Sequence, residues 1–395
     1  MRFRFMGTRR VLAVIFIGCM AATSISAQSP SLDAAHFAAL TARFQDALDT
    51  LHQREGFPGA TAAFILPDGR YEGFAVGMSD REKQTPMGPD TRSMSGSIGK
   101  TFVAAVAIGL VQDGKLTLDD PVAKWLKDKP WFERLPNANT ITLRMLLTHS
   151  AGLMDHVNQK GFADAITKMI ASGDRDAYIK PEEMIGFILD KKPLYEPGKG
   201  YAYTDTGYLV VGMLIEEVTG ETYYDLLQER ILDPLALNLT VPTNTRHIPG
   251  LTPGYTKKEN PFGLPEELFL DGEIRINPAS EWTGGGLATN SKDLVRWAKA
   301  LYEEKALDKP YIKDLVESGF KKDPKGHYGL GVFVRETPMG MTYGHSGWFP
   351  GYNASMTYYA ERKVAVAIQI NRDFDNKSEY VTELAQVVLS ALDGK

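Results

Sequence analysis

A serine and a lysine stand three positions apart at the start of an apolar stretch, in the run Ser97-Ile98-Gly99-Lys100. Residues three apart share one face of a helix, so Lys100 can point at the Ser97 hydroxyl. A hydroxyl at a helix N-terminus also lies beside unsatisfied backbone N–H groups, which favour negative charge. The pattern indicates a serine nucleophile, but S-x-x-K is common by chance and Ser97 could equally be a helix N-cap.

Two later segments carry groups that could assist such a serine. The run 203–208 reads Tyr-Thr-Asp-Thr-Gly-Tyr and supplies a phenol and a carboxylate, and Gly344-His345-Ser346-Gly347 supplies an imidazole on an expected strand. The ordinary alternatives are an aromatic loop that leads into a helix and a structural histidine. Neither segment is specific when it is taken alone.

Other catalytic motifs are missing from the sequence. Gly99-Lys100-Thr101 resembles the end of a phosphate-binding loop, but Met94 stands where that loop needs a glycine. The chain has no G-x-S-x-G run, and none of its seven histidines forms H-E-x-x-H. These absences count against an α/β-hydrolase and against a zinc protease.

The elements that must position these residues are strands at both ends of the chain and helices between them. Sequence patterns predict helices over 35–51, 98–112, 208–218, 291–302 and 379–392, and strands over 60–66, 71–76, 328–334, 341–345, 352–359 and 363–370. We therefore expect an α/β (α+β) fold in which the two termini build one antiparallel sheet. The expected lobes are a sheet lobe of residues 28–100 and 285–395 and a mostly helical lobe of residues 101–284.

Composition limits the class of function. The chain has 395 residues, 43% of them hydrophobic, and a formal net charge of −5. This content excludes a disordered protein, and the scattered basic pairs argue against a nucleic-acid partner or a polybasic membrane surface. The length exceeds what one hydrophobic core usually serves, so two lobes are expected.

Residues 1–27 predict an export signal. Arginines precede the apolar run 11–22, which is too short to span a bilayer, and small residues follow up to Ala27. Lipidation at Cys19 is disfavoured because Phe16 stands where a lipoprotein signal has a small aliphatic residue. Cleavage after Ala27 would leave a periplasmic or secreted chain without cysteine and without stable membrane insertion.

Taken in order, the segments resemble the serine β-lactamase and penicillin-binding-protein superfamily, in its class C β-lactamase-like branch with D-Ala-D-Ala carboxypeptidases and family VIII esterases. The resemblance covers nearly all of the chain after the signal, through residues 92–105, 146–153, 203–208, 284–289, 328–331 and 343–371. Two positions depart from the family pattern. Asp205 stands where Asn is frequent, and His345-Ser346-Gly347 stands where β-lactamases usually have Lys-Thr-Gly. Both departures count against an efficient β-lactamase.

The resemblance implies a five-stranded antiparallel sheet flanked by helices, a helical lobe, and a site in the groove between them. It implies that Ser97 is the nucleophile, that Lys100 and Tyr203 move its proton, and that the N–H groups of Ser97 and Trp348 form the oxyanion hole. A nearby cation is expected to lower the pKa of the Tyr203 phenol from about 10.

The resemblance also assigns the groups that bind substrate, namely His345, Ser346, Gly347 and Asp205, and it requires no metal or organic cofactor. An ionised Asp205 only accepts hydrogen bonds, so it is expected to hold Lys100 protonated and to favour substrates that bring an amine. The alternative is that Asp205 caps the helix that follows it.

The sequence thus predicts a secreted serine hydrolase that cleaves amide or ester bonds of a small molecule or peptide through an acyl-Ser97 intermediate. A D-amino-acid peptidase or carboxypeptidase and a carboxylesterase are equally supported, and a β-lactamase comes third. A penicillin-binding sensor or scaffold without turnover is the alternative from another class. The oligomeric state is left open.

Overall fold

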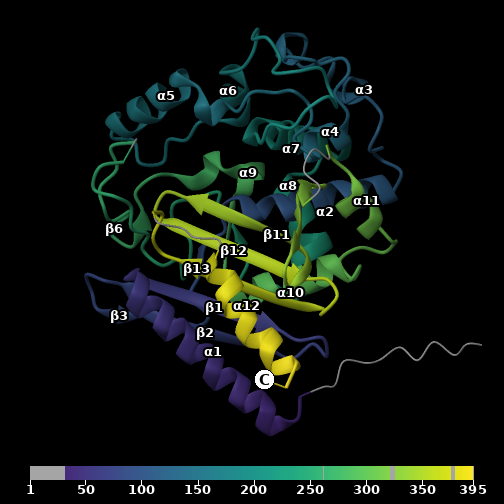
Figure 1. Cartoon of the computed structure of the whole chain (residues 1–395). Helices are drawn as coiled ribbons and strands as arrows, with labels where there is room; N and C mark the ends of the chain where they lie inside the picture. The colour runs from purple at the N-terminus through teal and green to yellow at the C-terminus, as the bar shows by residue number, and fades with distance from the viewer. Residues whose placement is uncertain (1–31, 261, 321–324, 375–378, 395) are drawn as a thin grey trace, which may run out of the picture. The chain divides into compact units, whose positions relative to one another are not determined.

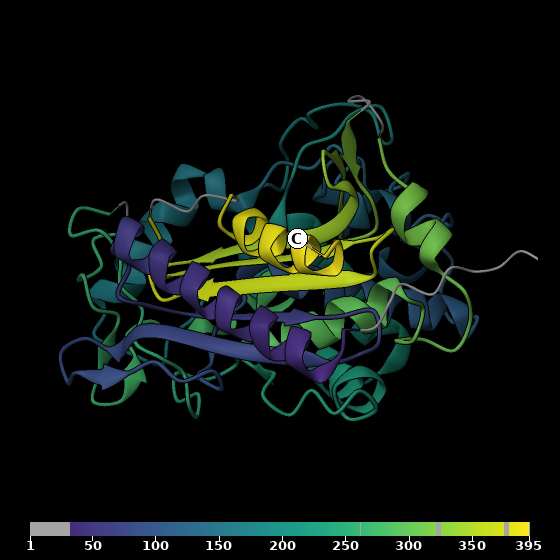
Figure 2. The ribbon, with the colours of Figure 1, turned by 60° about the horizontal axis from the view of Figure 1, so that its bottom comes forward.

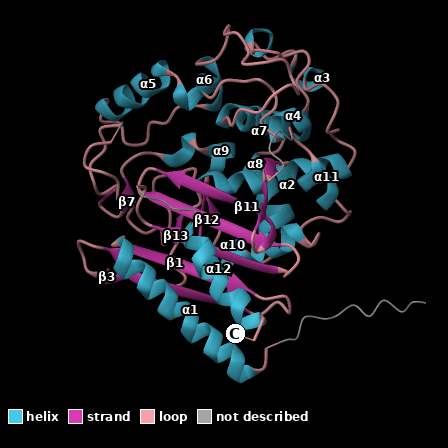
Figure 3. Cartoon of the chain, in the orientation of Figure 1, coloured by secondary structure: helices cyan, strands magenta, loops and turns pink. Residues whose placement is uncertain are grey.

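A large antiparallel sheet organises the computed structural model, which describes residues 32–260, 262–320, 325–374 and 379–394. The predicted export signal lies outside these residues. Within them the sheet has eight strands: β1 (Gly59–Ile65), β2 (Tyr71–Asp80), β3 (Thr85–Pro86), β9 (Gly326–Tyr328), β10 (Phe333–Thr337), β11 (Gly340–Phe349), β12 (Tyr352–Tyr359) and β13 (Val364–Ile370). Their order is β3-β2-β1-β13-β12-β11-β10-β9, so the two ends of the chain meet in the middle of the sheet (Figure 3).

Both faces of the sheet are covered by helices. Helices α1 (Ala34–Glu55) and α12 (Glu379–Leu392) lie together across one face, and α10 (Ser291–Tyr302) packs on the other (Figures 1 and 2). Strand β1 is buried along its whole length, and its successive side chains point alternately to the two faces of the sheet. Ala62 and Phe64 join the core under α1 and α12, whereas Ala63 and Ile65 join the larger core on the other side.

The region between β3 and β9 contains most of the described helices. Its remaining helices are α2 (Gly99–Gln112), α3 (Ala123–Leu126), α4 (Leu143–Leu147), α5 (Lys160–Ala171), α6 (Pro181–Gly186), α7 (Asp205–Thr219), α8 (Tyr223–Leu227), α9 (Trp282–Gly285) and α11 (Ile312–Glu317). Its strands are short: β4 (Ser93–Met94), β5 (Val241–Pro242), β6 (Phe269–Leu270), β7 (Glu273–Ile274) and β8 (Leu287–Thr289). The division into two lobes at the expected boundaries stays a prediction.

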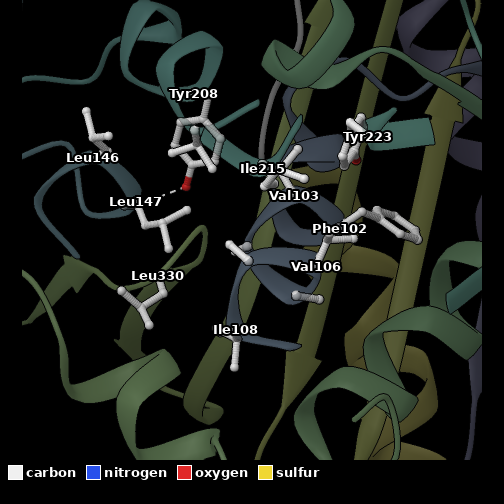
Figure 4. Packing of buried hydrophobic residues seen from close by; sticks show 14 of the residues in the cluster. Phe102, Val103, Val106, Ile108, Leu146, Leu147, Tyr208, Ile215, Tyr223 and Leu330 are labelled. Carbon is white, nitrogen blue, oxygen red and sulfur yellow. Dashed lines mark hydrogen bonds between the residues drawn. The ribbon is translucent and has the colours of Figure 1, made fainter. Parts of the chain in front are cut away.

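Helix α2 runs through the centre of the larger core. Its residues from Gly99 to Leu110 are all buried, as expected for a helix that is apolar almost all round. Figure 4 shows Val103 and Val106 of α2 among side chains from α4 and α7. The Tyr208 hydroxyl of α7 donates a 2.8 Å hydrogen bond to the Leu147 carbonyl, which ties α7 to the end of α4.

The expected antiparallel sheet between flanking helices is confirmed, and α10, β12 and α12 have the predicted bounds. Two details are corrected. The sheet has eight described strands instead of five, because three short strands extend it at its edges. The single strand expected over 328–334 is two strands, β9 and β10. Between them Gly331 adopts a φ of +73°, and a Cβ on Gly329 would lie only 2.1 Å from the Leu315 carbonyl oxygen.

Helix α10 fixes the first turn of α2. Trp297 of α10 is fully buried and stacks on Phe102 of α2, with ring centroids 4.1 Å apart. Its indole N–H donates a 2.7 Å hydrogen bond to the Thr101 hydroxyl. The sheet-covering helix therefore holds the helix turn that carries the predicted lysine.

We expect Trp297→Ala to lower the free energy of unfolding by about 3–5 kcal/mol, the cost of removing a buried tryptophan. Trp297→Phe keeps an aromatic ring but loses the indole hydrogen bond, so it should cost about 1–2 kcal/mol. Urea unfolding followed by circular dichroism measures both. The control is Tyr178→Ala, at a tyrosine that is 42% exposed, with an expected change below about 1 kcal/mol. Wild-type stability in Trp297→Ala would contradict this assignment.

Candidate active site

The predicted nucleophile lies in a 3₁₀ turn, Gly96–Ile98, that leads directly into α2. Ser97 is partly exposed, and Lys100 follows it in the first turn of α2 with its side chain fully buried. The Lys100 ammonium donates a 3.1 Å hydrogen bond to the Ser97 hydroxyl oxygen, as the spacing of three predicts. The neighbouring Ser95 is fully buried, and its hydroxyl donates to the Gly285 carbonyl at 3.2 Å.

Three segments of the chain meet at the buried Lys100 ammonium. Besides Ser97, it contacts the Gly284 carbonyl at the end of α9 and forms an ion pair with the Asp205 carboxylate at the start of α7. Burial alone would lower the pKa of Lys100, but Asp205 and Tyr203 outweigh burial and raise this pKa above its ordinary value. Lys100 is therefore an ammonium in the free protein.

Tyr203 places its phenol beside the same two groups. The Lys100 Nζ atom lies 5.2 Å from the centroid of the Tyr203 ring, and the hydroxyl is buried next to Ser97 and Lys100. The expected fall in the Tyr203 pKa is wrong. Burial raises the pKa of the phenol to about 12, because the loss of hydration outweighs the attraction of the ammonium.

Asp205 is the first residue of α7, and the residue before it caps the helix. The Thr206 N–H donates a 3.1 Å hydrogen bond to the Thr204 hydroxyl, so the alternative that Asp205 is the cap is wrong. The Asp205 carboxylate instead turns to Lys100 and keeps a quarter of its side chain exposed. The charge that was expected to hold Lys100 protonated is therefore in place.

Two further carboxyl groups, Asp155 and Glu281, join Asp205. The Asp205 N–H lies 3.3 Å from the Asp155 carboxylate, and a methyl group placed on Gly284 would lie 3.9 Å from both the Asp205 carboxyl carbon and a Glu281 carboxylate oxygen. Burial and the Asp205 charge raise the pKa of Asp155 to about 7 and that of Glu281 to about 8. We call Asp155, Asp205 and Glu281 the acidic cluster.

The sequence reasoning missed Asp155 and Glu281. Asp155 follows the segment 146–153 that carried part of the family resemblance, but no spacing relates it to Ser97. Glu281 stands three residues before the Gly284 carbonyl that accepts from Lys100, and nothing in its local sequence marks it. Only the folded chain brings the two together.

Strand β11 passes directly against the serine turn. A Cβ on Gly347 would lie 1.8 Å from the Ser95 carbonyl oxygen, and one on Gly96, whose φ is +50°, would lie 2.6 Å from the Trp348 nitrogen. Glycine is required at both positions for this approach. The two backbone N–H groups expected to form an oxyanion hole, those of Ser97 and Trp348, thus belong to segments in contact.

His345 lies on β11 near Tyr203 but is already engaged within the protein. Its Nε2 is 2.8 Å from the Tyr328 hydroxyl, and its Nδ1 is 2.6 Å from the Ser346 carbonyl oxygen. Burial, reinforced by the Lys100 charge, lowers the pKa of His345 to about 3, so the ring is neutral. A direct bond from His345 to substrate would have to replace one of these contacts, whereas the Ser346 side chain is exposed.

His149, which the sequence reasoning also missed, holds the segment that carries Tyr203. It adopts a φ of +55°, and its Nδ1 accepts a 3.2 Å hydrogen bond from the Thr204 N–H. Its carbonyl accepts from the Ala202 N–H at 3.0 Å and from the Tyr195 hydroxyl at 3.0 Å. The imidazole also packs on the Tyr203 ring, with centroids 4.2 Å apart.

An apolar pocket begins at the acidic cluster. Asp205, Glu281, Gly284 and Trp348 line its end nearest Lys100. Its other walls are largely hydrophobic and include Phe162, Ile166, Met169, Met184, Phe262 and Ile276. The pocket therefore combines negative charge at the serine with hydrophobic walls away from it.

Two features are absent from the described residues. We find no group of three or more histidine, cysteine, aspartate or glutamate side chains arranged to hold a metal ion among them. No described helix combines the length and the hydropathy that crossing a membrane requires.

Curated proteins of related sequence include penicillin-binding proteins and D-aminopeptidases. Penicillin-binding protein 4* of Bacillus subtilis (strain 168) is 25% identical over 88% of this chain and 74% of its own length. A D-aminopeptidase of Brucella anthropi is 25% identical over 84% of this chain, which spans 59% of that longer protein.

Solved structures with the same fold include D-specific hydrolases. A D-stereospecific amidohydrolase from Streptomyces sp. superposes with a TM-score of 0.74 at 26% identity, covering 87% of this chain and 97% of the other. The D-amino acid amidase of Ochrobactrum anthropi SV3 in complex with D-phenylalanine gives the same TM-score and identity, covering 90% of this chain and all of the other.

The family model described as Beta-lactamase matches residues 44–389, from α1 to α12. This match covers the serine turn, the Tyr203 segment and β11, and it agrees with the relatives and with the antiparallel sheet. The chain therefore belongs to the Beta-lactamase family and is a serine hydrolase related to penicillin-binding proteins and D-aminopeptidases.

Proposed function

We propose that the protein hydrolyses the amide bond that follows an N-terminal D-amino acid with a free amino group and a hydrophobic side chain. The observation that carries this proposal is the acidic cluster at the mouth of the apolar pocket. The names of the relatives, a D-aminopeptidase and D-amino acid amidases, support the D configuration. An ester in place of the amide would satisfy the same contacts.

The carboxyl groups around Lys100 could balance a second positive charge. Asp155 and Glu281 lie close to the Asp205–Lys100 ion pair, and burial together with the Asp205 charge raises the pKa of both groups, so each can still gain a negative charge when a cation binds. A substrate ammonium would relieve the repulsion among the carboxylates. A β-lactam or an ester that lacks an amine brings no such charge, which is why we place such substrates second.

The apolar pocket suits the side chain of the same residue. It begins at Asp205 and Glu281, so an α-ammonium bound there would direct the neighbouring side chain between α5 and α6. Its largely hydrophobic walls suit an apolar or aromatic side chain. The scissile carbonyl would then lie at Ser97.

In this proposal Ser97 attacks that carbonyl and forms an acyl-enzyme. The Ser97 oxygen bonds to the carbonyl carbon, the C–N bond breaks, and the serine proton passes through Lys100 and Tyr203 to the departing amine. The N–H groups of Ser97 and Trp348 would stabilise the oxyanion. Water then releases the D-amino acid by the reverse proton path.

The substrate itself would help to free the base. In the free protein Asp205 holds Lys100 protonated, and a protonated amine cannot accept the Ser97 proton. A substrate ammonium beside Asp205 adds positive charge near Lys100 and lowers its pKa, which favours proton release. Substrates without the ammonium should therefore lose kcat as well as affinity.

We also propose that the protein acts outside the cytoplasm, after removal of residues 1–27. The support is the arginine-rich start and the short apolar run described above.

Ser97→Ala is expected to abolish covalent labelling by a fluorophosphonate, which reacts with an activated serine hydroxyl. Intact-mass spectrometry should show a single adduct on the wild type and none on this variant. Ser95→Ala is the matched control and should keep the adduct, because Ser95 is buried and donates to a backbone carbonyl. A persistent adduct in Ser97→Ala would refute the nucleophile assignment.

Lys100→Ala and Tyr203→Phe should each lower kcat for D-phenylalanine amide by about 10²–10⁴, the range for a lost acid–base group. The double variant should be little worse than either single variant, because both residues act in one proton path. Tyr71→Phe, at an exposed tyrosine, serves as the control. If each single variant lowers kcat only slightly and the double variant shows the product of the two losses, the residues act independently and a shared proton path is refuted.

Binding of 2-phenylethylamine, an amine probe of the proposed site that stays protonated up to about pH 10, should strengthen by about tenfold from pH 6 to pH 9. The pKa of Asp155 is about 7 and that of Glu281 about 8, so both gain negative charge over this range. Inhibition constants measured against D-phenylalanine amide test this. Asp155→Asn and Glu281→Gln should each flatten the profile, and a flat wild-type profile would remove the acidic cluster as the amine site.

A further inference from the structure

Trp348 presents two different groups to the site. Its backbone N–H is an expected oxyanion donor, since β11 lies against the serine turn at this point, and its indole lines the apolar pocket. The side chain is 47% exposed, so packing alone does not fix the orientation of the ring. A further contact is needed to orient it.

Asp373, which follows the end of β13, holds Trp348 through two hydrogen bonds. Its backbone carbonyl accepts the indole N–H at 3.0 Å, and its carboxylate accepts the Gly351 N–H, also at 3.0 Å. Gly351 lies in the turn between β11 and β12 and adopts a φ of +84°. One aspartate therefore binds both the ring of Trp348 and the turn that follows its strand.

Asp373 is itself fixed by its neighbours. Its N–H donates a 3.2 Å hydrogen bond to the Tyr255 carbonyl, and the Tyr255 N–H lies 3.2 Å from the Gly351 carbonyl oxygen. The preceding carbonyl, that of Arg372, accepts from the Asn353 side chain of β12 at 2.8 Å. The contact with Trp348 thus starts from a residue that has little freedom to move.

We infer that Asp373 is a positioning residue that holds Trp348 in one orientation, so that its N–H faces the scissile carbonyl while its indole selects the side chain of the same substrate. This inference rests on the proposed function and adds a specificity-determining residue to it. The acidic cluster recognises the amine, whereas Trp348 responds to the size of the side chain. Because one residue carries both the oxyanion donor and a pocket wall, a side chain that packs on the indole also stabilises the position of the donor.

Two substrates that differ only in the side chain test the inference, D-phenylalanine amide and D-alanine amide. Asp373→Ala removes the acceptor of the Gly351 N–H. It should lower kcat/KM about tenfold for D-phenylalanine amide and about threefold for D-alanine amide, part of the 10²–10³ loss that removal of a whole oxyanion donor causes. The smaller loss is expected because a methyl group is too short to pack on the indole. Asp373→Asn keeps an acceptor oxygen and should restore most of both rates.

A double-variant cycle isolates the role of the indole. Trp348→Ala keeps the backbone N–H and removes the ring, so it should lower the preference for D-phenylalanine amide over D-alanine amide about tenfold. In this background Asp373→Ala should not lower the preference further, because the ring that Asp373 holds is gone. The matched control is Asp33→Ala, which removes a carboxylate that accepts the His36 N–H at 2.8 Å at the start of α1 and should change no rate.

The outcomes separate this inference from the proposed function. Equal losses on both amides in Asp373→Ala, no recovery in Asp373→Asn, or a preference that falls further in the double variant would overturn the inference while the D-aminoacyl activity stands. No hydrolysis of either amide by the wild type would overturn the proposed function. The rate of fluorophosphonate labelling then tests the positioning role alone, since labelling needs the oxyanion donors but no amine. Labelling about tenfold slower in Asp373→Ala and restored in Asp373→Asn supports that role, and equal labelling rates overturn it.

Discussion

The buried ammonium of Lys100 is the constraint on which the rest of the site depends. A charge removed from water costs several kcal/mol unless it is paired and hydrogen-bonded, so the fold must bring acceptors to this one point. It does so from three segments, the serine turn, the end of α9 and the start of α7. The segments that supply hydrogen-bond acceptors to the ammonium also bring the serine hydroxyl, the phenol and the Asp205 carboxylate close to one another. The contacts that stabilise the buried Lys100 ammonium are therefore the same contacts that assemble the site.

The surface around Lys100 differs in charge between the side of Asp205 and the side of Tyr203. The side of Asp205 is acidic and leads into hydrophobic walls, and the side of Tyr203 leads through Phe333 to exposed cations.

Local features of the site could be read from the sequence, and features created by folding could not. The Ser97–Lys100 contact follows from helix spacing, and the bounds of β12 agree with those that the strand pattern predicts. Asp155 and Glu281 reach the site through loop paths that no periodicity encodes. The pKa of Tyr203 moves opposite to the expectation because its sign depends on burial, which one sequence does not reveal. The break between β9 and β10 depends on close packing of Gly329 against α11.

The pairing of β1 with β13 also sets the order in which this chain can fold. The Gly59 N–H donates to the Asn371 side chain across 312 positions, and the two strands are neighbours along their whole length. Contacts of such separation form slowly, because a long loop must close before they are gained. Until β13 arrives, β1 presents an open apolar edge that other chains can pair with. A chain shortened before β13 would thus lose more than its last strand: it would keep every residue from Ser97 to His345 and still be prone to aggregate.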